Sequence, residues 1–394
     1  MFYVGIDIAK QSHQVAVIDN KSSIVVKPFV FQNSQSGFNK LVISLTKADI
    51  TKDNSSFAME ATGHYWFALY FYLTDLGFDV KVFNPIQTDA FRDLSIRKVK
   101  NDIVDSINIA ELLRFGKFSS CTVPDENTIA LKNLSRFRFS MVDLCGDLKR
   151  KAVCILDQVF PEYDKLFSDI FGVTSKQLLL NFTTPDDLNS ISIIKLSNFI
   201  SKASQGRLGR AKAESIKQAA SNSIGINFAL DSFSFQLKQL IEQIDFTEKQ
   251  IEEIDIELEK LLLNTDYGVI TTIIGISSTL GSVIVGEIGD IYRFETAPKL
   301  VAYAGLDASV KQSGNFVGTQ NKISKRGSPY LRRALWMAAF VASQKDPALS
   351  IYYSNLIARG KSHKLALTAV ARKLCNIVWA VLRSKNPYVP NIQN

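Results

Sequence analysis

Two long segments with apolar residues at heptad spacing constrain this fold more than any other feature of the sequence. In residues 131–159, apolar residues recur seven apart on two tracks, one of which is interrupted by Arg138. In residues 230–261, the corresponding tracks contain a single polar residue, Thr247. Repeats kept over about four heptads are typical of coiled coils rather than of surface helices. We therefore expect two long helices that pair, either within one chain or between chains.

The first third of the chain alternates apolar, β-prone segments with helical patterns. Strands are expected at residues 2–8, 14–18, 24–31, 57–60 and 79–83, and an aromatic-rich helix at about 65–76. Strands that alternate with helices are typical of a mixed α/β domain, which we place at residues 1–118.

Two further parts follow this domain. Residues 119–264 are expected to form a coiled-coil linker with a polar, serine-rich insertion at about 161–223. Residues 265–394 are expected to be mainly helical, with apolar helices near 330–343 and 365–382. There the segment TTIIGISSTLGSVIVGEIGDIYRF places a Gly/Ser turn between two apolar helices. It resembles a helix-hairpin-helix, whose turn amides can hold a DNA phosphate.

Composition excludes several classes of protein. The chain has 394 residues, of which 46% are hydrophobic and 21% charged, and this argues against disorder as its main state. No apolar run approaches the roughly 18 residues of a membrane helix, and the N-terminus lacks the pattern of a secretion signal, so we expect a soluble, cytoplasmic protein without a membrane partner. Four cysteines without CxxC spacing suggest neither a zinc site nor a disulfide framework.

Positive charge is concentrated at the C-terminal end of the chain. The net charge is +8, yet residues 313–394 alone contain thirteen Lys or Arg residues and one acid, Asp346. A basic region beside a mildly acidic remainder suits a polyanion, because neutralising phosphates releases their counterions. The alternative is a basic surface that only faces water.

Four acids form the main candidate site. Asp7 ends the first expected strand in VGIDIAK, and Glu60 ends the fourth in FAMEATG. Asp102 and Asp105 lie three apart at the start of a helix and therefore share one face. Such a set suits two divalent cations roughly 4 Å apart that clamp the oxygens of a phosphodiester. Mg²⁺, or Mn²⁺ in its place, is the expected metal.

Each acid also has a simpler interpretation. Asp102 and Asp105 are the kind of acids that the helix dipole favours at a helix start. Actin-like ATPases and sugar kinases also have GID at the end of their first strand. However, the second Asp-Gly phosphate loop of those enzymes is not found midway along this chain. Basic residues before Asp102 suit a nucleic-acid backbone beside the acids. They are Arg92, Arg97, Lys98 and Lys100.

These residues together resemble the DEDD transposases of bacterial insertion sequences of the IS110 type. GIDIAK, MEATG and VKNDIVDSINIAELL are similar to that family's RuvC-like domain, which has the RNase H fold. GEIGDIYRF, LVAYAGL, KQSG and KISKRGSPYLRRAL are similar to its second transposase domain. The resemblance covers nearly the whole chain and implies a DNA transposase or recombinase.

The resemblance also implies a mechanism. It makes Asp7, Glu60, Asp102 and Asp105 the metal ligands of the RuvC-like domain, and a serine of the second domain the nucleophile that forms a covalent phosphoserine with DNA. By motif position this serine is Ser313 in KQSG, with Ser324 in ISKRG as the nearest competitor. Contacts to nucleic-acid phosphates are expected from Lys322, Lys325, Arg326, Arg332 and Arg333.

Partners follow from the same resemblance. Family members bind donor and target DNA and a structured noncoding RNA made from the element's own end, so that base pairing chooses the sequence. They assemble as homodimers that pair into a homotetramer, with a site composed of acids from one chain and the serine from another. The resemblance thus implies a nucleoid-associated bacterial protein.

Two other functions remain open on the sequence. One is a RuvC-like metal-dependent DNA nuclease of the junction-resolving type, which uses water and forms no covalent intermediate. The other is a non-catalytic nucleic-acid scaffold, which needs the basic C-terminal region but none of the four acids.

Overall fold

The structure is a computed structural model that describes residues 1–93, 101–116, 118, 125–308, 312–313, 316–317 and 322–390. For 312–313 and 316–317 it describes the backbone alone. The chain divides into two compact units, Met1–Val123 and Pro124–Asn394.

Unit 1 is built on a five-stranded mixed sheet, which confirms the expected α/β domain. The strands are β1 (Phe2–Asp7), β2 (Ser12–Ile18), β3 (Ile24–Gln32), β4 (Ser55–Glu60) and β5 (Asp79–Phe83). Their order is β3-β2-β1-β4-β5. The first three strands are antiparallel neighbours, whereas β4 runs parallel to both β1 and β5.

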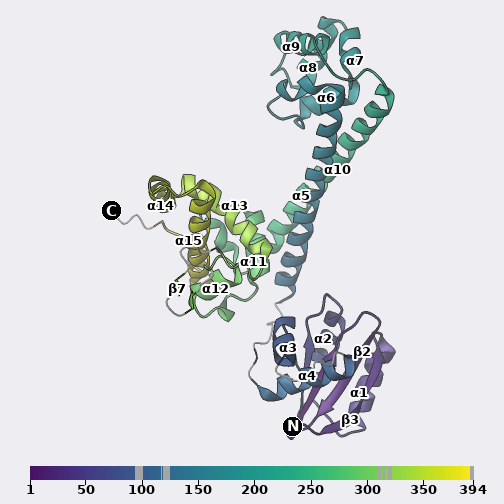
Figure 1. The fold of residues 1–394 in the computed structure, drawn as a ribbon, viewed down its shortest axis with the longest axis vertical. Helices are drawn as coiled ribbons and strands as arrows, with labels where there is room; N and C mark the ends of the chain where they lie inside the picture. Colours follow the sequence, from purple (N-terminus) through teal and green to yellow (C-terminus); the bar gives the residue numbers. More distant parts are fainter. Residues whose placement is uncertain are drawn as a thin grey trace. The chain divides into compact units, whose positions relative to one another are not determined.

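Helices cover both faces of this sheet (Figure 1). They are α1 (Gln35–Thr46), α2 (Trp66–Asp75), α3 (Pro85–Arg92) and α4 (Asp102–Phe115). Val4 and Ile6 of β1 belong to the core with α1 and α2, whereas Ala58 of β4 packs with Ile109 of α4 on the other side. Because side chains alternate along a strand, Gly5 and the acids that end β1 and β4 share the α4 face.

Gly5 allows α4 to lie directly on the sheet. A Cβ atom at this position would be 2.1 Å from the carbonyl oxygen of Ser106 and 2.4 Å from the backbone nitrogen of Ala110. No side chain fits at such distances. The first turn of α4, which starts at Asp102, is thereby brought to the ends of β1 and β4.

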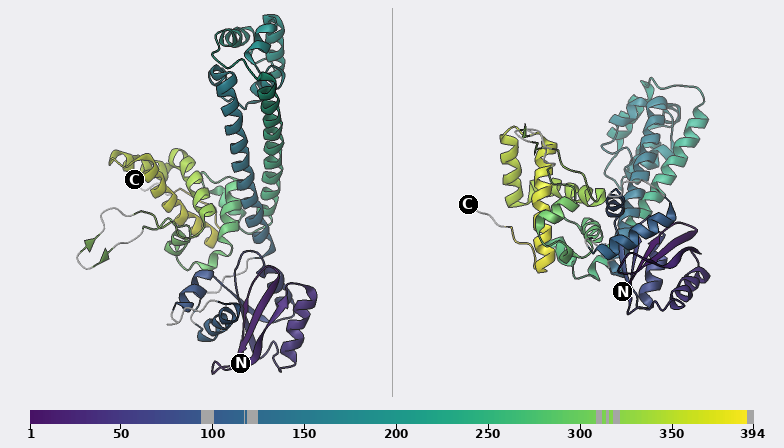
Figure 2. Two further views of the ribbon diagram at one scale, coloured as in Figure 1. Left: turned by 45° about the vertical axis from the view of Figure 1, so that its right-hand side comes forward. Right: turned by 60° about the horizontal axis from the view of Figure 1, so that its bottom comes forward.

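Unit 2 contains the two expected long helices, α5 (Glu126–Val159) and α10 (Leu230–Leu263), and they pair within the chain. They lie side by side in every view (Figure 2). Arg138, the charged residue that interrupts the heptads, donates from Nε and Nη2 to the carboxylate of Asp255 on α10, at 2.6 and 2.9 Å. Thr247 is buried, and its hydroxyl donates to the carbonyl oxygen of Gln243 at 2.7 Å.

The expected polar insertion folds as a small helical cap at one end of this pair. It consists of η1 (Pro161–Lys165), α6 (Val173–Asn181), α7 (Pro185–Ser190), α8 (Ile193–Ala203) and α9 (Arg210–Ser221). Its core includes Tyr163, Leu179 and Ile216 and joins apolar residues of α5 and α10. Thr184 and Ser192 cap the starts of α7 and α8, so the serine and threonine content of the insertion serves its short helices.

The other end of the helix pair packs in the main core of unit 2. The elements there are η2 (Gly268–Thr272), α11 (Ser278–Ile288), η3 (Ile291–Arg293), α12 (Ala297–Tyr303), β6 (Gln312–Ser313), β7 (Phe316–Val317), α13 (Pro329–Lys345), α14 (Pro347–Ala358) and α15 (His363–Ser384). The helices expected near 330–343 and 365–382 are confirmed. The prediction of two helices in the expected helix-hairpin-helix is wrong for the first of them. The 3₁₀ helix η2 lies at that place, and only the second, α11, is an α-helix.

Among the described residues, α15 is the one helix long and apolar enough to cross a membrane. Its apolar residues form part of the core, where Val370, Leu374 and Val378 are fully buried. Arg372 and Lys373 lie on its exposed side. This burial identifies α15 as the core helix of a folded domain.

Candidate active site and serine hairpin

The four predicted acids line one cavity of unit 1, which we call the acidic cavity. Asp7 and Glu60 end β1 and β4, which are parallel neighbours, so both carboxylates reach the same edge of the sheet. Asp102 and Asp105 come from the first turn of α4, where the side chain of Asn101 caps the helix. The cavity has a volume of about 390 Å³. Residues separated by almost a hundred positions are thus brought together.

Asp7 carries the clearest electrostatic signal in the acidic cavity. The pKa of its carboxyl is raised to about 6, first by burial and then by the negative charges of Asp102, Asp105 and Glu60. A backbone hydrogen bond from Ile8 acts against them. The cavity therefore holds more negative charge than its own residues neutralise.

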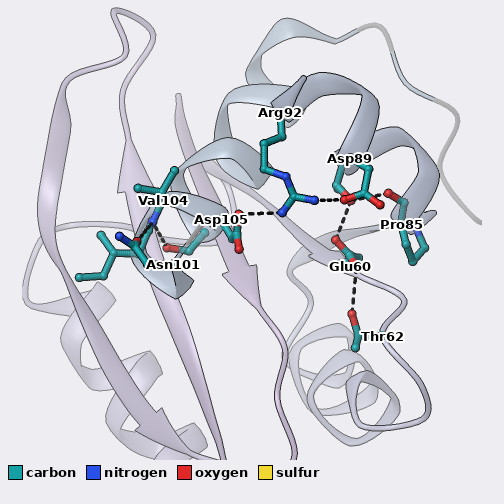
Figure 3. Close-up of polar contacts among 11 residues, drawn as sticks. Glu60, Thr62, Pro85, Asp89, Arg92, Asn101, Val104 and Asp105 are labelled. Carbon is teal, nitrogen blue, oxygen red and sulfur yellow. Dashed lines mark hydrogen bonds and ion pairs between the residues drawn. The ribbon is translucent and has the colours of Figure 1, made fainter. Parts of the chain in front are cut away.

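Two threonines hold the carboxylate of Glu60, and Figure 3 shows the hydrogen bond from Thr62. The hydroxyl of Thr62 donates to Oε1 at 3.0 Å, and that of Thr88 donates to Oε2 at 2.6 Å. Thr88 is on α3, so this helix is tied to the end of β4. Neither threonine was predicted from the sequence, although Thr62 follows Glu60 closely in the MEATG motif.

Arg92 is the one basic residue among the described residues that line the acidic cavity. Its Nη1 lies 3.2 Å from Oδ1 of Asp105, and its Nη2 pairs with Asp89 (Figure 3). In the structure Arg92 binds two carboxylates, and its contact with nucleic acid stays a prediction. The spacing of Asp89 and Arg92, three apart on α3, was the signal that could have predicted the ion pair between them.

The donor set of the acidic cavity fits a hard divalent cation. Carboxylate oxygens are the ligands that Mg²⁺ and Mn²⁺ prefer, and the described lining of the cavity has five acids against one arginine. Within the described part of the chain, no three acids, histidines or cysteines are already arranged around one ion position. Asp105 is instead held by Arg92.

Ser313 lies in a short β-hairpin of unit 2, which we call the serine hairpin. Its strands β6 and β7 are antiparallel, with Ser313 opposite Phe316. The contacts of the Ser313 side chain lie outside what the structure describes. Nearer the helical core, Ala308 and Ile323 form a backbone bridge.

Ser324, the competing serine, is held by its neighbours. Its hydroxyl donates to the carboxylate of Asp307, and its backbone nitrogen donates to the Asp307 carbonyl oxygen at 2.8 Å. The backbone nitrogen of Arg326 in turn donates to the Ser324 hydroxyl oxygen at 3.3 Å.

The predicted nucleic-acid contacts differ in their surroundings. Arg332 donates to the carbonyl oxygen of Ala304 at 3.1 Å. Arg333 forms a bidentate ion pair with Asp143, at 2.9 and 3.1 Å. Of the other predicted residues, Lys322, Lys325 and Arg326 are exposed, while Arg97, Lys98 and Lys100 lie outside the described residues.

Comparison with known protein families gives matches in both units. Residues 4–161 match the DEDD family model of the IS110 type, described as transposase. Residues 267–354 match the model described as the transposase IS116/IS110/IS902 family. The four acids lie within the first match and Ser313 within the second.

Individual relatives are similar over most of their length. A pilin gene-inverting protein of Moraxella bovis is 26% identical over 98% of this chain and 97% of its own. A putative transposase for the IS117 mini-circle of Streptomyces coelicolor is 24% identical over 92% of this chain and 89% of its own. An uncharacterized 43.6 kDa protein of insertion element IS110, also of S. coelicolor, is 24% identical over 80% of this chain and 78% of its own. With both family models matched in order, this chain belongs to the IS116/IS110/IS902 family of transposases, enzymes that act on DNA.

Proposed function

We propose that this protein cuts and rejoins the DNA of an insertion sequence through a phosphoserine at Ser313, assisted by Mg²⁺ or Mn²⁺ held in the acidic cavity. The single observation that carries the proposal is the convergence of Asp7, Glu60, Asp102 and Asp105 on one cavity. A cation bound by these acids would polarise the phosphate and make its phosphorus more electrophilic.

The fold supports an RNase H-like, RuvC-like assignment for unit 1. Its mixed sheet has three antiparallel strands followed by two parallel ones, and it carries two of the acids at the ends of adjacent strands. Thr62 and Thr88 keep Glu60 in place through hydrogen bonds to both of its oxygens. Above about pH 6, the ionised Asp7 completes the charge of the cavity.

The serine step exchanges one phosphoester for another. The hydroxyl oxygen of Ser313 forms a bond to phosphorus while the bond from phosphorus to the departing DNA oxygen breaks. The serine loses its proton, and the departing oxygen takes one up. A hydroxyl of a second DNA strand then reverses the exchange, which joins the strands and frees the serine without any external energy source.

Assembly into dimers and tetramers is part of the proposal. Phe235, Phe246 and Ile256 on α10 expose 67%, 64% and 57% of their surface, which suits contact with a second chain. The acids of one chain and the serine of another would then form a composite site. Size-exclusion chromatography with light scattering tests this, since a monomer at all concentrations would contradict it.

The remaining partners rest on the family resemblance. They are donor and target DNA and a structured noncoding RNA derived from the element, which would choose the sequence by base pairing. We place the protein in the bacterial cytoplasm, associated with the nucleoid. Omitting the RNA from the reaction should then abolish sequence-specific joining, while nonspecific DNA binding persists.

The decisive experiment is a search for a denaturant-resistant protein–DNA adduct. Wild-type protein is incubated with Mg²⁺, the element's DNA junction and its end-derived RNA, and compared with the variants Ser313→Ala, Asp7→Ala and Ser324→Ala. The adduct should form in the wild type and in Ser324→Ala, and disappear in the other two. Loss in Ser324→Ala alone would move the nucleophile to Ser324.

One alternative function also fits the acidic cavity. A RuvC-like nuclease that attacks with water would need the same acids but no serine. Cleavage by the wild type and by Ser313→Ala, without any adduct, would establish this nuclease and refute the phosphoserine.

A further inference from the structure

A second cavity, which we call the basic cavity, lies in unit 2 and has a volume of about 750 Å³. Its walls come from α14, α15 and the chain on either side of the serine hairpin. Among the described residues that line it are four cations and no acid; these cations are Lys322, Lys361, Arg372 and Lys373. Of these four, only Lys322 was predicted to contact nucleic acid, and the proposed function gives no role to Lys361, Arg372 or Lys373.

The chain after Asp346 brings no acid to the basic cavity. It contains no further Asp or Glu, and Asp346 itself is fully buried, where it caps α14 and accepts a hydrogen bond from Tyr388 at 3.0 Å. Lys361 and Arg372 are exposed and form no ion pair with any described residue. The charge of its described walls therefore favours an anion.

The wall chemistry favours a nucleic-acid strand over a small anion. The ring of Tyr352 lies 3.8 Å from Nζ of Lys373, and the apolar side chains of Leu356 and Leu365 also line the cavity. Cations beside an aromatic ring and aliphatic surface match phosphates that alternate with sugars and bases.

The spread of the cations points to more than one phosphate. Arg372 follows the first residue of α15, His363, by nine positions, which is about 14 Å along a helix. Lys361 lies just before that helix start. One DNA strand advances about 3.4 Å per phosphate along a duplex, so the cations span several phosphates of a polymer.

The basic cavity also adjoins the serine hairpin. Ala308 and Ile323, which form the backbone bridge below that hairpin, both line the cavity. Ser313 follows Ala308 by five residues, so their α-carbons are within about 18 Å of each other. A strand that occupies the cavity passes close to the hairpin.

We infer that the basic cavity binds the phosphate backbone of the DNA strand that Ser313 attacks, with Lys361, Arg372 and Lys373 as its main contacts. This inference rests on the proposed function for the identity of the strand. Binding in the cavity holds the strand near the serine hairpin before any bond changes. Its contacts go to phosphates, so they carry no sequence preference.

DNA binding by the full chain tests the inference without requiring catalysis. Fluorescence anisotropy with labelled double-stranded DNA, in EDTA and without RNA, compares wild type with Arg372→Ala/Lys373→Ala. The matched control, Lys195→Ala/Lys202→Ala, removes two exposed lysines of α8 and the same charge. We expect the first variant to bind DNA about tenfold more weakly. The slope of its log affinity against log salt concentration should also become shallower by about two units. The control should change neither quantity.

Charge-conserving and RNA variants complete the test. Arg372→Lys/Lys373→Arg should keep affinity within about twofold of wild type, because it keeps both charges in place. Equal affinity of wild type and Arg372→Ala/Lys373→Ala for DNA would overturn the inference. So would a loss confined to a labelled RNA hairpin, which would make the cavity an RNA site.

The two proposals fail separately. If the adduct experiment fails while Arg372→Ala/Lys373→Ala still loses DNA affinity, the cavity binds DNA but the phosphoserine function is wrong. If the adduct forms equally in wild type and this variant at DNA concentrations below saturation, the function stands and the inference is overturned.

Discussion

Arg136 on α5 and Glu287 on α11 form a bidentate ion pair inside unit 2, with Nε to Oε1 at 2.6 Å and Nη2 to Oε2 at 3.0 Å. The side chain of Glu287 is fully buried. Its Oε2 also accepts a hydrogen bond from the hydroxyl of Ser328, which caps α13, at 2.8 Å. One buried carboxylate thus joins three helices beside the chain that returns from the serine hairpin.

The first prediction concerns this ion pair. Arg136→Ala should lower the free energy of unfolding by about 3 kcal/mol, because it leaves the buried Glu287 carboxylate without its counter-charge. Arg150→Ala is the control on the same helix, since Arg150 pairs with Asp147 at the surface, and it should cost less than about 0.5 kcal/mol. Urea denaturation followed by circular dichroism measures both. Equal midpoints for the two variants would refute the role of Glu287.

The second prediction concerns pH and Asp7. Its pKa is about 6 in the folded protein and 3.8 for an unperturbed aspartate side chain, so folding favours the protonated carboxyl. That stabilisation is complete below about pH 4 and is lost as pH rises through about 6. Without metal, Asp7→Asn should therefore be more stable than wild type at pH 8, by about 1 kcal/mol after allowance for partial exposure, and lose this advantage at pH 4.

Thermal unfolding in EDTA at both pH values measures this effect. Asp53→Asn, at an exposed position of unit 1, serves as control. Its melting temperature should change between the two pH values by the same amount as that of the wild type. A wild type whose melting temperature rises relative to Asp7→Asn between pH 4 and pH 8 would contradict the raised pKa.

The third prediction concerns the competition between Arg92 and a metal ion for Asp105. Removing the guanidinium in Arg92→Ala frees the carboxylate and adds one uncompensated negative charge to the acidic cavity. We expect Mn²⁺ to bind about tenfold more tightly, which corresponds to about 1.4 kcal/mol. Isothermal titration calorimetry compares this variant with the control Arg114→Ala. Arg114 pairs with Glu111, and both lie on α4, the helix that also carries Asp105. Weaker Mn²⁺ binding by Arg92→Ala would show that Arg92 supports the site.

The fourth prediction concerns the contact between Gly5 and α4. Gly5→Ala should displace α4, reduce the stability of unit 1 by more than about 3 kcal/mol and abolish Mn²⁺ binding, because the added carbon meets backbone atoms that cannot move aside. Gly146→Ala in α5 is the control. There the new Cβ meets only the end of the Arg150 side chain at 3.5 Å, and the change should stabilise the helix by up to about 1 kcal/mol. Unchanged melting of Gly5→Ala would refute the close approach.

Local patterns were sufficient to predict much of this protein. Heptad spacing identified α5 and α10, because the period of burial along a helix depends on neighbouring residues alone. Short apolar, β-prone segments identified the strands of unit 1, because they too are local patterns. The acids were found because Asp7 and Glu60 are charged residues at the ends of apolar strands, a place where a carboxylate needs a partner.

What the tertiary structure decided depends on residues far apart in the chain. Only the fold shows that α5 and α10 pair within one chain, that Arg138 meets Asp255, and that the serine-rich insertion has a core of its own. Only the fold brings Thr88 to Glu60. The pKa of Asp7 likewise follows from burial and from charges almost a hundred positions away, which no local pattern records. Periodicity is a property of a segment, whereas contacts and electrostatics are properties of the packed molecule.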